Sequence, residues 1–257
     1  MSNKSAFDAV GHESLADAVV DQIETMIVDG ILKEGHKLPS ERELSDALGV
    51  SRPKLREALQ TLEQRGLVNV RHGEGTFIAK LTGRAMSPAL LALYTRHGRA
   101  FYDYLEYRRE QEAFACRLAA KRATQSDKTR LTEILDVMVE THKSADTEAS
   151  RDADLKLHAA VVDASQNTTL IHMMASVYDL TRQGVFYNRA FLRTMDGTGQ
   201  KLLTQHKDIV DAILAGDPEL ADAAARTHID FVEASYRQSE EQHAREERAA
   251  KRKQLAT

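Results

Sequence analysis

The feature that most constrains the fold lies in the first third of the chain, where closely spaced helix signals are followed by strand signals. Ser40 and Glu43 have the spacing of a capping box, which starts a short helix that Gly49 ends. Ser51 is predicted to cap the next helix. Pro53 fits in the first turn of that helix because its missing N–H has no intrahelical partner there. The pattern predicts a helix, a tight turn and a second helix.

A preceding helix and a following hairpin complete this region. Ser14 is a suitable N-cap for a first helix that ends near Gly30. After Gly66 the segments LVNV and TFIAK have strand character, and the glycines of the intervening RHGEG suit a hairpin turn. We therefore expect a winged helix-turn-helix domain over residues 14–80.

Positive charge in this domain is concentrated where a DNA-reading helix would begin. The whole chain has a net charge of −4, which argues against a general polyanion binder and makes the local distribution decisive. A helix N-terminus also favours phosphate through its N–H groups and its dipole. Basic residues at the hairpin tip could approach a phosphate or the minor groove. The candidates for DNA contact are Arg52, Lys54, Arg56, Arg71, His72 and Gly73.

The sequence pattern after residue 80 predicts helices and no strands, so we expect a mainly α fold. Apolar residues recur at helical spacing, and no run of about 18 apolar residues offers a membrane span. We expect a linker with a short helix over residues 81–99 and a helical domain, an antiparallel all-α bundle, over residues 100–240. The predicted helices lie near residues 100–123, 127–144, 147–165, 168–190, 197–215 and 218–245.

The two ends of the chain and its cysteine content give weaker expectations. Residues 1–13 lack the features of a secretory signal and are expected to form a flexible arm. The charged tail, residues 241–257, is expected to be a solvated helix end that frays into disorder. Cys116 is the one cysteine, so no internal disulfide can form, which fits a cytoplasmic protein.

Four residues of the helical domain have the side chains of a metal site. Asp154 and His158 are four residues apart, which places both on one face of a helix. His206 and His228 lie on two other predicted helices. If the helices bring them together, the set would suit Zn²⁺, Ni²⁺ or Mn²⁺, but the spacing also allows structural or surface histidines. Asp152 lies off the face of His158 and is the weaker carboxylate.

The run LPSERELSDALGVSRPKLREALQTLEQRGLVNVRHGEGTFI resembles the DNA-binding domain of the GntR family, specifically its FadR-type branch. The resemblance covers about residues 14–80. It implies that the arginine of PSERE, the residues that open the recognition helix and the wing tip contact DNA. In this sequence these residues are Arg42, Ser51, Arg52, Arg56, His72 and Gly73. For Arg42, a surface salt bridge within its own helix is the alternative.

Residues of about 100–235 are similar to the ligand-sensing helical bundle of the same branch, through YRREQEAFACRLAAKRA, DADLKLHAAV and QHKDIVDAILAGDPELADAAARTHI. The resemblance implies that a divalent metal is bound by one Asp and three His. It also implies a small carboxylate effector held by the metal and by an arginine of the first long helix. Arg108 fits that place, with Arg109 as the competing choice, and Arg182 and Asn188 are further candidates from their helix positions. The implied metal ligands are Asp154, His158, His206 and His228.

These features predict a transcriptional regulator, most simply a repressor, that binds a palindromic double-stranded operator as a homodimer and responds to a small organic acid. Zn²⁺ is the first expectation for the metal. A metalloenzyme with an Asp/His₃ centre is the main alternative, but the sequence has no HExxH motif and no phosphate-binding glycine loop. A regulator that senses the metal itself is a further alternative. We expect no enzymatic activity.

Overall fold

The computed structural model describes residues 14–81, 99–182 and 197–255 of the chain. The chain divides into two units, with the division between residues 83 and 84. Each unit has a hydrophobic core of its own. The predicted flexible arm and most of the predicted linker, with its short helix, lie outside the described residues.

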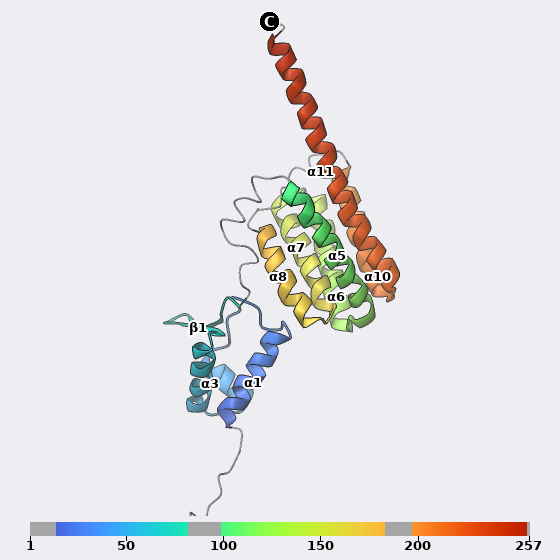
Figure 1. Ribbon diagram of the computed structural model, residues 1–257. Coiled ribbons are helices and arrows are strands. Elements are labelled where there is room, and N and C mark those ends of the chain that lie inside the picture. The colour runs from blue at the N-terminus through green and yellow to red at the C-terminus, as the bar shows by residue number, and fades with distance from the viewer. Residues whose placement is uncertain (1–13, 82–98, 183–196, 256–257) are drawn as a thin grey trace, which may run out of the picture. The chain divides into compact units, whose positions relative to one another are not determined.

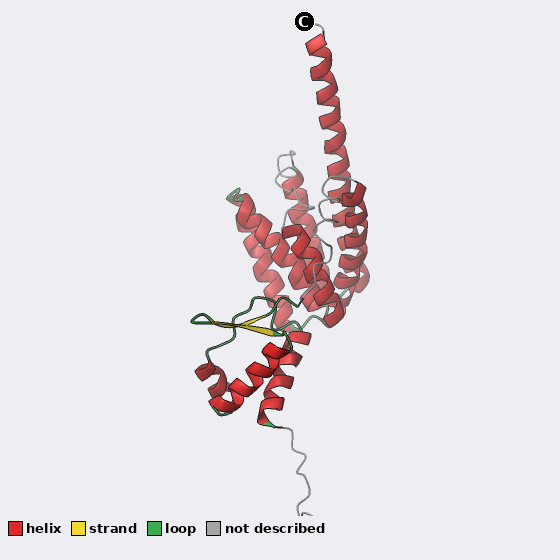
Figure 2. Ribbon diagram, turned by 60° about the vertical axis from the view of Figure 1, so that its left-hand side comes forward, coloured by secondary structure: helices red, strands yellow, loops and turns green. Residues whose placement is uncertain are grey.

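The N-terminal unit consists of three helices followed by an antiparallel hairpin, as predicted (Figures 1 and 2). Capping boxes begin the first two helices, between Ser14 and Asp17 and between Ser40 and Glu43. Gly49 ends the second helix in the left-handed conformation, with φ of 65°. The elements are α1 (Leu15–Val28), α2 (Glu41–Leu48), α3 (Arg52–Gln64), β1 (Val68–Arg71) and β2 (Gly75–Ile78).

The beginning of α3 differs from the prediction in one respect. Ser51 occupies the N-cap position with extended backbone, but its side chain makes no capping hydrogen bond to the described backbone of α3. A capping hydroxyl normally accepts from the N–H of the second or third helical residue, and Pro53 has no N–H to donate. The Ser51 side chain is exposed.

The core of the N-terminal unit forms where α1, α3 and the hairpin meet. Ile23 of α1 packs with Leu55 and Leu62 of α3, which have no exposed surface. Val68 and Ile78 pair across the two strands and close the same core. Burying each such side chain contributes about 1.5–3 kcal/mol, so this small unit can hold the exposed ends of α2 and α3 in place.

The C-terminal unit is a bundle of helices, which confirms the predicted fold class (Figure 1). The helix α5 packs against α7, α10 and α11, while α6 packs against α7 and α10, and α8 packs against α7. Residues 183–190 of the predicted helix 168–190 lie outside the described residues. The helices are α5 (Arg99–Arg122), α6 (Gln125–Lys143), α7 (Thr147–Ala164), α8 (Thr168–Arg182), α10 (Thr198–Ala215) and α11 (Pro218–Leu255).

Small residues let the helices of this bundle approach closely. Ala113, Ala115 and Ala119 of α5 have no exposed surface, and larger side chains such as Leu157 and Ile213 fill the space between helices. A close-packed interior of this kind fixes the register of the helices. Polar side chains that point inward from different helices are therefore held at defined separations.

The predicted helix over residues 218–245 continues further than expected, so the expectation of disorder is wrong for residues 246–255. The helix α11 continues to Leu255 and extends beyond the other helices of its unit (Figures 1 and 2). Within this extension, Arg245 pairs with Glu241 and His243 with Glu247 at the i,i+4 spacing. Such pairs, together with residues of high helix propensity, support an exposed helix without a core to pack on.

No helix in the described part of the chain is long and apolar enough to cross a membrane.

Candidate metal centre and nucleic-acid interface

The predicted DNA-contacting residues of α3 lie on its exposed surface. Arg52 and Arg56 are exposed, and Arg56 Nε donates to Glu41 Oε2 of α2 at 2.8 Å. Lys54 is half-buried and pairs with Glu57 at 2.8 Å. Because exposed ion pairs contribute at most about 1 kcal/mol, a phosphate can compete with these carboxylates for the cations.

In the wing, the basic side chain of Arg71 packs over the aromatic ring of Phe77. The guanidinium of Arg71 lies 4.5 Å from the centre of the Phe77 ring, and Arg71 also pairs with Glu74 at 3.6 Å. His72 and Gly73 are exposed at the turn, where Gly73 has φ of 78°. The ring limits the directions that Arg71 can take, which favours a defined contact at the tip.

Three further basic residues of the N-terminal unit, Arg42, Arg65 and Lys37, lie in different surroundings. Arg42 is exposed on α2, and its backbone carbonyl accepts a hydrogen bond from the Ser45 hydroxyl at 3.0 Å. No ion pair joins its side chain to another described residue, which argues against the salt-bridge alternative. Arg65 pairs with Glu24 of α1 at 2.6 Å and so links two helices. The sequence analysis did not identify Lys37 as a candidate. Its backbone forms an isolated β-bridge with Phe77, and its Nζ lies 5.9 Å from the centre of the Phe77 ring, so Lys37 belongs to the wing.

The helical unit brings together the four predicted metal ligands in its interior. The ligand atoms of three histidines, His158 of α7, His206 of α10 and His228 of α11, lie within 4.8 Å of one another. Asp154 of α7 joins two of them, because its Oδ1 lies 3.0 Å from His206 Nε2 and 3.6 Å from His158 Nε2. Asp152 is exposed and takes no part.

The spacing of these atoms fits a metal ion. Ligand atoms at about 2.0–2.1 Å from a tetrahedral metal lie about 3.3 Å from one another. His158 Nε2 and His206 Nε2 are 3.4 Å apart, and the two Asp154 distances lie on either side of the same value. One carboxylate and three imidazoles are also the donor types that Zn²⁺ and similar ions take. The residues present therefore fit a divalent metal.

Residues that the sequence analysis missed orient two of the histidines. His158 Nδ1 lies 2.9 Å from Glu112 Oε2, and His228 Nδ1 lies 3.2 Å from Gln205 Oε1. Because both oxygens accept hydrogen bonds, each Nδ1 carries the proton, and each Nε2 can face the metal. Glu112 could have been suspected as an acid on the buried face of α5. Gln205 had no comparable signal.

Glu112 is the centre of a buried polar cluster. Its Oε1 accepts hydrogen bonds from Arg108 Nε and, at 3.3 Å, from the Tyr178 hydroxyl. Burial alone would raise the pKa of Glu112, but Arg108 and His158 outweigh it and lower the pKa to about 2. Burial likewise opposes the charge of Arg108, and Glu112 outweighs it and raises its pKa. Both side chains are therefore charged inside the protein.

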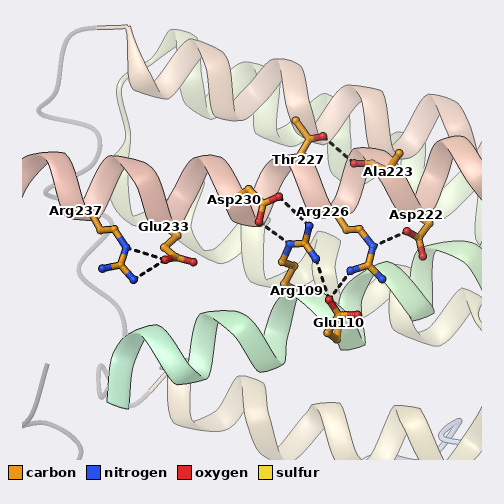
Figure 3. A network of polar contacts seen from close by, with 9 residues as sticks. All are labelled: Arg109, Glu110, Asp222, Ala223, Arg226, Thr227, Asp230, Glu233 and Arg237. Carbon is orange, nitrogen blue, oxygen red and sulfur yellow. Dashed lines mark hydrogen bonds and ion pairs between the residues drawn. The ribbon is translucent and has the colours of Figure 1, made fainter. Parts of the chain in front are cut away.

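Arg108 and Arg109, the two candidates for the effector arginine, point in different directions. Arg108 is buried, with its side chain 6% exposed. Arg109 lies on the outer surface of α5, where its Nε and Nη2 donate to the Asp230 carboxylate of α11 at 2.6 and 3.0 Å (Figure 3). It belongs to a network that also includes Glu110 and Arg226 and that links α5 to α11. The geometry therefore disfavours Arg109.

A small cavity adjoins the histidines. Its polar wall includes Glu112, His158, His206 and Tyr178, while Arg108 donates a hydrogen bond to Glu112 and is not among the described lining residues. Cys116 also lines the cavity, where burial raises the pKa of its thiol well above the usual value. The apolar wall is formed by Ala115, Leu157, Val161, Val162 and Ile209. Asn188 and the side chain of Arg182 lie outside the described residues.

Comparison with known families assigns both units. The gntR family of bacterial regulatory proteins matches residues 15–78, and the FCD domain matches residues 103–231. The chain belongs to the GntR family. This confirms the resemblance seen in the sequence, and the FCD match is consistent with the FadR-type branch.

Curated relatives extend over most of this GntR-family chain. A regulatory protein of Escherichia coli (strain K12), named for the L-lactate dehydrogenase operon, is 34% identical over 238 residues, which is 91% of each chain. The HTH-type transcriptional regulator LutR of Bacillus subtilis (strain 168) is 34% identical over 209 residues, covering 81% of this chain and 94% of LutR. A solved structure of a Streptococcus agalactiae GntR protein has a TM-score of 0.53 at 24% identity, over 86% of this chain and 99% of that chain, and it supports the fold alone.

The matched families define the activity in general terms. The chain is a DNA-binding transcriptional regulator with an FCD effector-binding domain. Because these families are regulators, the metalloenzyme alternative is not supported, and the expectation of a protein without enzymatic activity is confirmed.

Proposed function

We propose that this GntR-family protein is a cytoplasmic repressor whose operator binding is controlled by a small organic acid bound beside a divalent metal. The metal, for which we propose Zn²⁺ with Ni²⁺ or Mn²⁺ as alternatives, is held by Asp154, His158, His206 and His228. A bound metal would supply positive charge and an open coordination position for a carboxylate oxygen.

One observation carries this proposal. The four residues come from three helices that are far apart in sequence, yet in the protein interior the ligand atoms of the three histidines lie within 4.8 Å of one another, and Asp154 Oδ1 lies 3.0 Å from His206 Nε2 and 3.6 Å from His158 Nε2. Burying an aspartate with three imidazoles is costly unless something compensates the charge. The Nδ1 atoms of His158 and His228 donate to Glu112 and Gln205, and such hydrogen bonds are expected around metal-bound histidines.

A small carboxylate is the proposed effector class. The cavity adjoins His158 and His206, so a ligand there would lie beside the metal. We propose that Arg108 contributes its charge to effector binding, together with Arg182 and Asn188. The relative named for the L-lactate dehydrogenase operon supports L-lactate as the first acid to test.

The DNA site that we propose consists of the exposed surface of α2, α3 and the wing. A two-fold dimer would place two such surfaces on a palindromic operator. Phosphate contacts would set affinity and its salt dependence, while α3 reads base edges in the major groove. The proposed contacts are Arg42, Ser51, Arg52, Lys54, Arg56, Arg71, His72 and Gly73.

The metal part of the proposal is tested by elemental analysis of the natively purified protein. We expect about one divalent ion per chain in the wild type and none in the His206→Ala, His228→Ala double variant. An equal metal content in both proteins would refute the site. If operator affinity followed metal occupancy with no acid present, the metal itself would be the signal.

Repression is the sign of regulation that we propose. The curated relatives include an activator, named for the Glc operon, and the repressor NanR. A reporter gene placed downstream of the operator distinguishes repression from activation. A repressor lowers reporter expression until the effector is added, whereas an activator raises it.

A further inference from the structure

A third segment of the chain, residues 35–38, lies along the free edge of the β2 strand of the wing. Lys37 of this segment forms an antiparallel bridge with Phe77, whose partner on the other side is Asn69 of β1. Three backbone hydrogen bonds hold the segment, from Leu38 to Thr76 at 2.9 Å, from Ile78 to His36 at 2.9 Å and from Gly35 to Ile78 at 3.1 Å. The segment that precedes α2 is therefore built into the wing.

This pairing places two cations on the same face of the wing. Lys37 and Phe77 form a non-hydrogen-bonded pair, in which the side chains lie closest together. Arg71 follows Asn69 by two residues on β1 and so points to that face as well. The Arg71 guanidinium and the Lys37 ammonium lie 4.5 and 5.9 Å from the centre of the Phe77 ring. Both basic side chains are exposed, whereas the ring is half-buried.

Gly75 gives the Lys37 side chain the room to extend toward the tip of the wing. A Cβ at position 75 would lie 3.1 Å from Lys37 Cε and 3.9 Å from its Nζ. The lysine therefore crosses the space that a larger residue would fill. Because Gly75 is the partner of Arg71 next to the turn, the ammonium lies near the end of the hairpin that carries the proposed DNA contacts.

Two cations around one ring form a site suited to an anion. The face of the ring attracts both of them, which offsets part of their mutual repulsion. The printed ion pair of Arg71, with Glu74 at 3.6 Å, is long and exposed, so a phosphate can displace the carboxylate. In a DNA-binding unit the matching anion is the sugar-phosphate backbone, which receives most protein–DNA hydrogen bonds.

We infer that Lys37 binds a phosphate of the DNA backbone together with Arg71, and that Phe77 is the positioning residue for both cations. This inference rests on the proposed DNA surface, to which it adds a residue from outside the helix-turn-helix and the hairpin. A phosphate contact carries no sequence information, so Lys37 contributes affinity and salt dependence to operator DNA and unrelated DNA alike.

The first test removes the charge of Lys37 and keeps its stem. Fluorescence anisotropy of the full-length protein measures binding to an operator selected from random DNA and to an unrelated duplex, each over a range of salt concentrations. Lys37→Met should bind both duplexes about three- to tenfold more weakly. The slope of log affinity against log salt should fall by about 0.9 for each chain that contacts the duplex. Wild-type affinity and slope would overturn the inference.

Lys80→Met is the matched control for this charge change. Lys80 is an exposed lysine of the same unit, beyond the other end of β2, and it pairs with Glu34 at 3.5 Å. Its substitution should leave the salt slope unchanged. An equal loss in the two variants would attribute the effect to net charge alone and would contradict a specific contact by Lys37.

The second test examines Phe77. Phe77→Leu keeps an apolar side chain but removes the ring and should weaken binding to both duplexes about threefold, whereas Phe77→Tyr keeps the ring and should restore wild-type affinity. In the Lys37→Met, Arg71→Met background, Phe77→Leu should change affinity less than about 1.5-fold, because neither cation remains to be positioned. An undiminished loss in that background would show that Phe77 only supports the wing.

The outcomes also separate this inference from the proposed DNA surface. If Lys37→Met and Arg52→Ala both bind the operator like the wild type, the proposed surface is wrong and the inference falls with it. If Arg52→Ala loses affinity and Lys37→Met does not, the surface stands and only the phosphate contact of Lys37 is wrong.

Discussion

The proposed DNA surface and the proposed metal site differ in how the chain builds them. The DNA-contacting candidates lie within residues 42–73 on neighbouring elements, and most of their side chains are exposed. The metal-ligand candidates span residues 154–228 and three helices, and none is more than 5% exposed. The first set needs only local structure and a small core to hold it in place. The second exists only when the whole bundle is folded.

The largest effect is expected from removing a ligand at the buried site. His228→Ala should weaken metal binding by about 10²–10³-fold, since four ligands share an apparent binding free energy of about 10–16 kcal/mol in structural zinc sites. Competition with a zinc chelator measures the affinity. The control is His243→Ala on the exposed extension of the same helix, where metal affinity should not change. Equal affinities in the two variants would contradict the assignment.

A smaller effect, confined to the other unit, is expected at the beginning of α3. Arg52→Ala and Arg56→Ala should each weaken operator binding by about 10- to 100-fold and should reduce its salt dependence if they contact phosphate. Fluorescence anisotropy with an operator selected from random DNA measures both quantities. Arg65→Ala, at the C-cap of the same helix, is the control, because its side chain pairs with Glu24 of α1. Wild-type operator affinity in both test variants would exclude this face of α3.

The wing should respond more weakly. Gly73 has φ of 78°, and a Cβ at this position would meet no atom within 4 Å, so an alanine strains the backbone without a clash. Gly73→Ala should therefore cost about 1 kcal/mol in the wing conformation and reduce operator affinity by about fivefold. Gly73→Asn should lose less, since asparagine tolerates this conformation. An asparagine variant that loses more than the alanine variant would show that side-chain size at the tip matters more than backbone strain.

The smallest effect is expected at the end of α11. Deleting residues 242–257 removes a helix that is exposed along almost its whole described length, so the melting temperature should change by less than about 2 °C. Circular dichroism should show the loss of helix, and metal content should not change. A large drop in melting temperature would mean that the extension packs against something, such as a second copy of the chain.

The sequence predicted the DNA-binding unit well because its signals are local. The N-cap at Ser14, the capping box at Ser40, the glycine after α2 and the hairpin all lie where the pattern placed them. The bundle helices were also predicted, with the exception of the part of α11 that follows residue 245. Its last turns have no apolar pattern, and their stability comes from propensity and i,i+4 pairs, which the sequence analysis undervalued.

The sequence identified the candidate ligands but not their surroundings. Whether Asp154, His206 and His228 meet depends on helix packing, which spacing along one helix does not determine. The role of Glu112 was missed because its partner His158 lies on another helix, and its pairing with Arg108 is one of many i,i+4 patterns in a charged chain. Arg108 and Arg109 are adjacent, and only the packing of α11 against α5 distinguishes the inner from the outer side chain.

The central claim is that the buried site controls the exposed one, and operator affinity measured with and without metal and acid tests it most directly. The account predicts that L-lactate or another small carboxylate changes operator affinity at least about fivefold in the zinc-loaded wild type, the usual lower range of allosteric coupling. The same acid should have no effect on the metal-free protein or on His228→Ala. An identical response in the metal-free protein, or no response to any small carboxylate in the zinc-loaded one, would contradict the account.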